Sequence, residues 1–135
     1  MFARRYLHGY LQGSLLLGLG LLLAGCSSPS LVSIQVTPTT QFFGGPGLSA
    51  QLTAIGTYQQ GNHPPTKQDI TDLVTWKSNA TAVATISSTG VVTSGSGTGS
   101  TAITASMNGF TGLVTATSNV TVCTTLNSTG TGCGS

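Results

Sequence analysis

From residue 31 onward, apolar and polar residues alternate along the chain, and most of them are Thr, Val, Ile and Ser. Successive side chains of a strand point to opposite faces of a sheet, so an alternation of period two predicts strands that are buried on one side. β-branched residues also fit strands better than long helices, and no segment carries a convincing helical stripe. Turn-forming residues divide the alternating segments. The pattern therefore predicts an all-β domain, a two-sheet β-sandwich of about seven short strands.

The alternation also predicts which side chains face the core. In segment 31–37, one face carries Val32, Ile34 and Val36. The dipeptide Asn108-Gly109 is a tight-turn signal between the last two segments. The other residues expected to face inward are Leu48, Ala50, Leu52, Ala54 and Tyr58 of segment 48–58, then Val74, Trp76, Ile103 and Ala105, and finally Val114, Ala116, Val120 and Val122.

Six short motifs follow one another in an order that resembles the bacterial immunoglobulin-like domain, group 2 (BIG2). The resemblance covers residues 31–122 and implies that the predicted sandwich is immunoglobulin-like, with Trp76 between its two sheets. The His63-Pro64-Pro65 loop is longer than the family pattern. The motifs are Ile34-Gln-Val-Thr-Pro38, Val74-Thr-Trp-Lys-Ser-Asn79, Ala82-Val-Ala-Thr-Ile86, Gly90-Val-Val-Thr93, Gly99-Ser-Thr-Ala-Ile-Thr-Ala105 and Val120-Thr-Val122.

The first 25 residues have the layout of a secretory signal, with a basic start, an apolar stretch and small residues before Cys26. The boundary Leu23-Ala24-Gly25-Cys26 resembles a bacterial lipobox, which implies a lipoprotein signal peptide over 1–25 and a lipidated Cys26 that begins a short tether, 26–30. The membrane is then a partner through this lipid anchor, and the expected location is the bacterial cell envelope, at the outer membrane if the host has two membranes. The alternatives are an ordinary secretory cleavage and a spanning helix, for which the apolar run is short of the roughly 20 residues required.

Charge excludes several function classes. Once the leader is removed, the charged residues that remain are Lys67, Lys77, Asp69 and Asp72, which sum to zero. Nucleic-acid binding requires clustered Lys or Arg, and metal sites or carboxylate pairs require residues that this chain scarcely has. No nucleophile stands beside a base in a known catalytic motif. We therefore expect no enzymatic activity, catalytic residue, metal or cofactor.

Two cysteines remain after Cys26. Cys123 and Cys133 bound a tail, 123–135, that is rich in Ser, Thr and Gly. An even number of thiols in an exported chain predicts a disulfide, which would hold the tail against the end of the last strand. Free thiols or an intermolecular bond are the alternatives.

The predicted function follows from the anchor, the sandwich and the missing catalytic groups. We expect a non-enzymatic, lipid-anchored envelope protein whose single domain serves adhesion or protein–protein contact with an unknown envelope or surface protein. The alternative is a protein that binds a glycan, either polysaccharide or peptidoglycan, through one polar loop. The possible ligand residues of that loop are Tyr58, Gln59, Gln60, Asn62 and His63.

Overall fold

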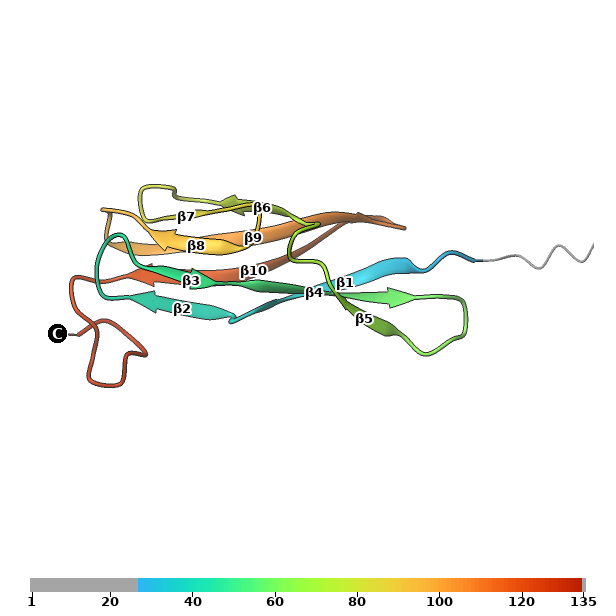
Figure 1. Cartoon of the computed structure of the whole chain (residues 1–135), viewed down its shortest axis with the longest axis horizontal. Helices are drawn as coiled ribbons and strands as arrows, with labels where there is room; N and C mark the ends of the chain where they lie inside the picture. The colour runs from blue at the N-terminus through green and yellow to red at the C-terminus, as the bar shows by residue number, and fades with distance from the viewer. Residues whose placement is uncertain (1–26, 135) are drawn as a thin grey trace, which may run out of the picture.

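The computed structural model describes residues 27–134, and this part of the chain consists of strands, turns and loops without a helix. The predicted all-β sandwich is confirmed, with ten strands in place of about seven (Figure 1). The predicted leader and Cys26 lie outside the described residues. Within residues 27–134, no helix is long and apolar enough to cross a membrane. The strands are β1 (Ser30–Thr37), β2 (Thr40–Phe43), β3 (Ser49–Gln51), β4 (Thr53–Gln59), β5 (Thr66–Asp69), β6 (Thr75–Ser78), β7 (Ala84–Ile86), β8 (Val91–Ser94), β9 (Gly99–Gly109) and β10 (Gly112–Val122).

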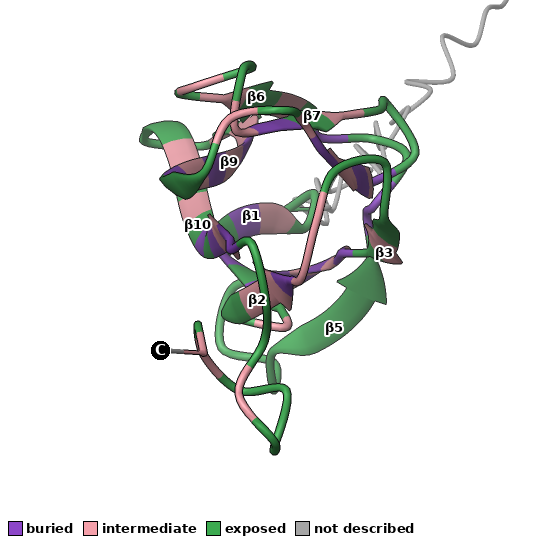
Figure 2. Cartoon of the chain, turned by 90° about the vertical axis from the view of Figure 1, so that its left-hand side faces the viewer, coloured by how far each residue is buried: buried purple, intermediate pink, exposed green. Residues whose placement is uncertain are grey.

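One layer of the sandwich is a four-stranded sheet in the order β2-β10-β9-β6. Its centre is the long antiparallel hairpin of β9 and β10, and β2 joins β10 in parallel. The other strands form two three-stranded sheets, β1-β4-β5 and β3-β8-β7. Because only Leu52 separates β3 from β4, these two sheets share one nearly continuous segment of chain. Viewed along the strands, the buried residues line the interior between the layers (Figure 2).

Leu52 is the residue at which this segment passes from one sheet to the other. Its side chain is fully buried, and its backbone N–H donates to the carbonyl of Gly90 at 2.8 Å. Gly90 has a φ of +81°, and a Cβ at that position would lie 2.5 Å from the Leu52 carbonyl oxygen. The close approach therefore requires glycine. The core around Leu52 consists of Leu31, Ile34, Val36, Phe43, Ala54, Ile70, Val74, Ala84, Val92, Ile103, Ala105, Val120 and Val122.

The first strand departs from the predicted alternation. The pairing of β1 with β4 contains an irregularity between Leu31 and Ser33, and this shifts the pattern by one residue. Leu31 is therefore buried, whereas Val32, predicted to face inward, is 51% exposed. Ile34 and Val36 face the core as predicted. Leu48, which lies just outside β3, is also exposed, contrary to the prediction.

The turn of the long hairpin lies further along the chain than predicted. Gly109 pairs with Gly112, so the connecting residues are Phe110 and Thr111, and the predicted turn Asn108-Gly109 belongs to β9.

The single Trp, Trp76, packs against the core cluster while remaining partly exposed, and its ring nitrogen donates to the carbonyl of Thr71 at 2.9 Å. Burial of the apolar ring beside a satisfied polar tip is the usual arrangement for this side chain.

Candidate functional site

The five residues predicted as a ligand loop do lie together, from the end of β4 into the β4–β5 connection. The Gln59 side-chain amide donates to the carbonyls of Gly61 and His63 at 2.8 and 2.5 Å, and the Gln60 amide donates to the carbonyl of Ser27 at 2.7 Å. Tyr58 packs against the core cluster. Two amides that a ligand would use are thus committed to the chain itself, while Asn62 and His63 remain exposed.

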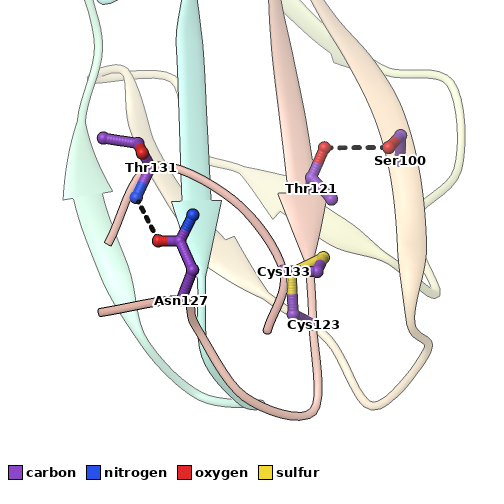
Figure 3. The surroundings of a disulfide bond; sticks show 6 residues. All are labelled: Ser100, Thr121, Cys123, Asn127, Thr131 and Cys133. Carbon is purple, nitrogen blue, oxygen red and sulfur yellow. Dashed lines mark hydrogen bonds between the residues drawn. A yellow bond between two sulfur atoms is a disulfide. The ribbon is translucent and has the colours of Figure 1, made fainter. Parts of the chain in front are cut away.

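Cys123 and Cys133 form a disulfide at the end of β10, and their Cα atoms are 5.4 Å apart (Figure 3). The enclosed loop is ordered by its own polar groups, since the Asn127 carboxamide oxygen accepts from the backbone N–H of Thr131 at 3.0 Å. The backbones of Leu126 and Cys133 also pair as an isolated antiparallel β-bridge. The tail is therefore a compact loop fixed to the sandwich.

The two carboxylates lie near a polar groove of about 690 Å³ at the β5–β6 connection. The hydroxyl and then the backbone N–H of Thr71 donate to Asp69 Oδ1, at 2.6 and 2.9 Å, and hold the pKa of Asp69 below its ordinary value of 3.8. Within residues 27–134, no three His, Cys, Asp or Glu side chains gather as a metal site would require. The residues that line the groove are Gln51, Thr53, Asp69, Thr71, Asp72, Leu73 and Thr89.

The outward side of the four-stranded sheet carries a regular array of small polar side chains, which we call the hydroxyl face. Cross-strand pairing places Thr104 opposite Thr117, and Ser106 opposite Thr115. Thr121 and Ser100 form a further pair, with their hydroxyls 2.8 Å apart (Figure 3). By strand register, the face consists of Thr40 and Phe42 of β2, Thr115, Thr117, Asn119 and Thr121 of β10, Ser100, Ala102, Thr104 and Ser106 of β9, and Thr75 and Lys77 of β6. The same register places Asn108 and Leu113 on this side of the sheet at the hairpin end, just beyond the hydroxyls.

The hydroxyl face is almost free of charge. Lys77 at the β6 edge is its one charged member, and neither β9 nor β10 contains an ionisable residue. Neighbouring strands lie about 4.8 Å apart, and side chains on one face of a strand repeat about every 6.8 Å. The face is therefore a two-dimensional array of side chains at fixed spacing, most of which carry a hydroxyl; the exceptions are Phe42, Ala102, Asn119 and Lys77.

Sequence reasoning missed this face because it used the alternation only to find the core. The signal was present in Thr115, Thr117 and Thr121, which occupy every second position of the last strand together with Asn119. The partner residues on β9 could be aligned with them only after the hairpin register was known.

Comparison with known proteins finds sequence similarity to a curated protein. Over 112 residues the chain is 42% identical to Ice-binding protein 1 of Shewanella frigidimarina (strain NCIMB 400), an alignment that covers 73% of this chain and 12% of that protein. The chain thus spans a small part of the relative's length. No family model matches the chain.

The relative's name contradicts the function predicted from the sequence. Adhesion or protein–protein contact was expected, with carbohydrate binding as the alternative, whereas the similar protein is named for ice. The error has a physical source: an uncharged surface rich in hydroxyls and amides was interpreted as a surface for proteins or sugars, and solid water offers the same hydrogen-bonding groups. The comparisons support neither the BIG2 resemblance nor the lipid anchor on Cys26, and both stay predictions.

Proposed function

We propose that this chain is a non-catalytic β-sandwich that binds ice through the hydroxyl face. The observation that carries the proposal is the in-register arrangement of hydroxyls on β9 and β10, two strands that lack charged residues. The name of the relative in Shewanella frigidimarina supports the same choice of ligand.

The chemistry of the face suits a crystalline water surface. A hydroxyl can donate one hydrogen bond and accept others, so one that does not already donate within the sheet can replace a water molecule at the edge of a lattice. The Ser106 hydroxyl donates to the Thr75 carbonyl, and the hydroxyls of Ser100 and Thr121 bond to each other. The contact with ice therefore depends most on Thr104, Thr115 and Thr117. The Thr side chain is stiff about χ1, and an already ordered array loses little entropy when it meets an ordered partner. A charged residue would instead lose hydration against a neutral solid, which is unfavourable.

The contact should be centred on the β9–β10 pair. Adjacent strands of a sheet are rotated by roughly 20–25°, so the outer strands turn away from a flat partner. Thr104 and Thr117 lie directly opposite each other near the middle of the two strands. They are therefore the positions at which an enlarged side chain should interfere most.

Partition into growing ice tests the proposal. The purified full chain should be incorporated into a slowly growing ice hemisphere, while a non-binding protein of similar size stays in the liquid. Thr117→Tyr should abolish incorporation because the ring holds the face away from the lattice. Thr85→Tyr, on an exposed position of β7, is the matched control and should leave incorporation unchanged. Exclusion of the unaltered chain from ice, or equal incorporation of Thr117→Tyr, would refute the proposal.

We also infer a location in the cell envelope, with the membrane as partner through a lipid on Cys26. Support comes from the apolar stretch and from the small residues that directly precede this cysteine. Two acyl chains are sufficient for stable anchoring. Mass spectrometry of the N-terminal peptide should find diacylglyceryl-modified Cys26 at the start of the mature chain, and an unmodified thiol there would exclude the anchor.

A further inference from the structure

The turn of the long hairpin exposes two large apolar side chains. Phe110 is 86% exposed and Leu113 is 66% exposed. Phe110 lies in the turn, and Leu113 is the second residue of β10. Single exposed apolar residues are common on protein surfaces, but these two are the most exposed large apolar side chains among residues 27–134, and both lie at one turn.

An apolar groove of about 440 Å³ adjoins this turn. One wall is the incoming chain from Ser27 to Leu31, and the other includes Met107 and Phe110. A Cβ on Gly109 would lie 2.6 Å from the carbonyl oxygen of Leu31, so the hairpin rests directly on the start of β1. The position of Phe110 relative to the incoming chain is therefore fixed by close backbone contact.

The point at which the chain enters the domain is also fixed. Gln60 from the β4–β5 connection donates to the carbonyl of Ser27, the residue that follows Cys26. The hairpin turn, the β4–β5 connection and the start of β1 lie at one end of the sandwich, and the C-terminal tail lies at the other (Figure 1). An anchor on Cys26 would thus hold this end of the domain toward the membrane.

The groove is lined without any charged side chain. Its polar members are Ser, Asn and Tyr, which can hydrogen-bond to lipid headgroups and their water, while Phe110 offers an apolar surface. Amphipathic arrangements of this kind are suited to the boundary between headgroups and acyl chains. A second copy of the chain or a peptide partner has no comparable reason to meet this particular end.

We propose that Phe110 and Leu113 insert into the interface of a phospholipid bilayer, so that the hairpin turn is a second membrane contact beside the anchor. The inference rests on the proposed envelope location and is independent of ice binding. Because the anchor would confine the domain to the surface, even a weak second contact would be occupied for much of the time. The contact would also fix the tilt of the sandwich on the membrane.

Fluorescence quenching by lipid can test this contact with the full chain reconstituted into phosphatidylcholine vesicles that contain acyl-chain-brominated lipid. A fluorophore is attached to Thr111→Cys at the exposed turn, and in a matched control to Thr98→Cys, which directly precedes β9. The two positions are separated by the whole length of β9, roughly 35 Å. We expect several-fold stronger quenching at 111 than at 98.

Serine substitutions test whether the quenching depends on the apolar side chains and not on the fluorophore itself. Phe110→Ser combined with Leu113→Ser should reduce quenching at 111 to the level at 98, whereas Leu73→Ser, another exposed apolar position, should have no effect. Recovery of the chain with the vesicles tests the lipid anchor separately. If the chain is recovered but the labels at positions 111 and 98 are quenched equally, the hairpin contact is refuted while the anchor stands. The same holds if the two serine substitutions leave the quenching at position 111 unchanged. Failure to recover the unlabelled chain with vesicles would refute both.

Discussion

The hydroxyl of Thr71 joins an exposed carboxylate to the buried Ala54 of β4, because it lies 2.6 Å from Asp69 Oδ1 and 2.9 Å from the backbone nitrogen of Ala54. It donates to the carboxylate and accepts from the N–H of β4. The side chain that ends β5 is thereby tied to the core of the neighbouring strand. The ring nitrogen of Trp76 completes this connection by donating to the Thr71 carbonyl.

Removal of this hydroxyl should destabilise the fold. Thr71→Val keeps the shape of the side chain but leaves the buried Ala54 N–H without its acceptor, which should cost about 1–3 kcal/mol. Thr71→Ser retains the hydroxyl and should recover most of the loss. Urea denaturation of both variants measures the difference, and equal stability of Thr71→Val and the unaltered chain would contradict the assigned hydrogen bond.

The same contact makes stability depend on acid pH. The bonds from Thr71 keep the pKa of Asp69 below 3.8, so the folded state favours the charged carboxylate more than the unfolded state does. Their contribution is present above pH 3.8 and is lost as the pH falls through the lower pKa of the folded state.

An NMR titration of the Asp69 carboxyl carbon should therefore find its midpoint below 3.8. In Thr71→Val the midpoint should rise toward that ordinary value, because one of the two donors is gone. An unchanged midpoint in the variant would show that the hydroxyl does not govern this carboxylate.

Two buried serines should respond differently to the same substitution. Ser118 is fully buried, and its hydroxyl has no hydrogen-bond partner among the described residues. Ser94 is also buried, but its hydroxyl donates to the carbonyl of Gly45 at 2.7 Å and accepts from the N–H of Leu48 at 2.9 Å. Ser118→Ala removes an unsatisfied polar group and should leave stability unchanged or raise it by about 1 kcal/mol.

Ser94→Ala should instead lower stability by about 1–3 kcal/mol, because it removes the partner of a backbone N–H. Thermal denaturation of the two variants side by side makes the comparison. A larger loss for Ser118→Ala than for Ser94→Ala would show that the Ser118 hydroxyl has a partner in solution.

The disulfide should stabilise the fold through the loop that it closes. Cys123 and Cys133 have a sequence separation of 10, for which the chain-entropy relation gives roughly 2.7 kcal/mol. The double variant Cys123→Ala and Cys133→Ala should lose about that amount in urea denaturation while the far-ultraviolet circular dichroism of the sandwich is retained. A loss of the strand signal would mean that the tail is required for folding.

The core could be predicted from the sequence because burial imposes a period of two on each strand. Leu52, Ile103 and Val120 are fully buried as the alternation predicts. Val32 was misplaced because the irregularity in β1 depends on its pairing with β4, which the local pattern does not contain. Two strands were absent from the prediction for related reasons: β5 is exposed at all four positions, and β2 is defined by parallel pairing with the distant β10.

The hydroxyl face was less accessible to prediction than the core. Burial selects apolar residues at fixed intervals, so the core is visible within one segment. An external face is formed by residues such as Thr104 and Thr117, which belong to different strands and meet only through the hairpin register. The groove beside Phe110 likewise depends on three segments that are far apart in the sequence.

The parallel pairing of β2 with β10 also determines how the domain should respond to tension. β1 begins at one end of the sandwich and β10 finishes at the other (Figure 1). A force that pulls these ends apart acts along the strands, so it shears the β1–β4 ladder first and then the β2–β10 ladder, in which residues Thr40–Phe43 pair with Asn119–Val122. In this geometry the ladder bonds share the load and must rupture together, whereas the disulfide keeps the tail from extending. The domain should therefore resist extension along this axis.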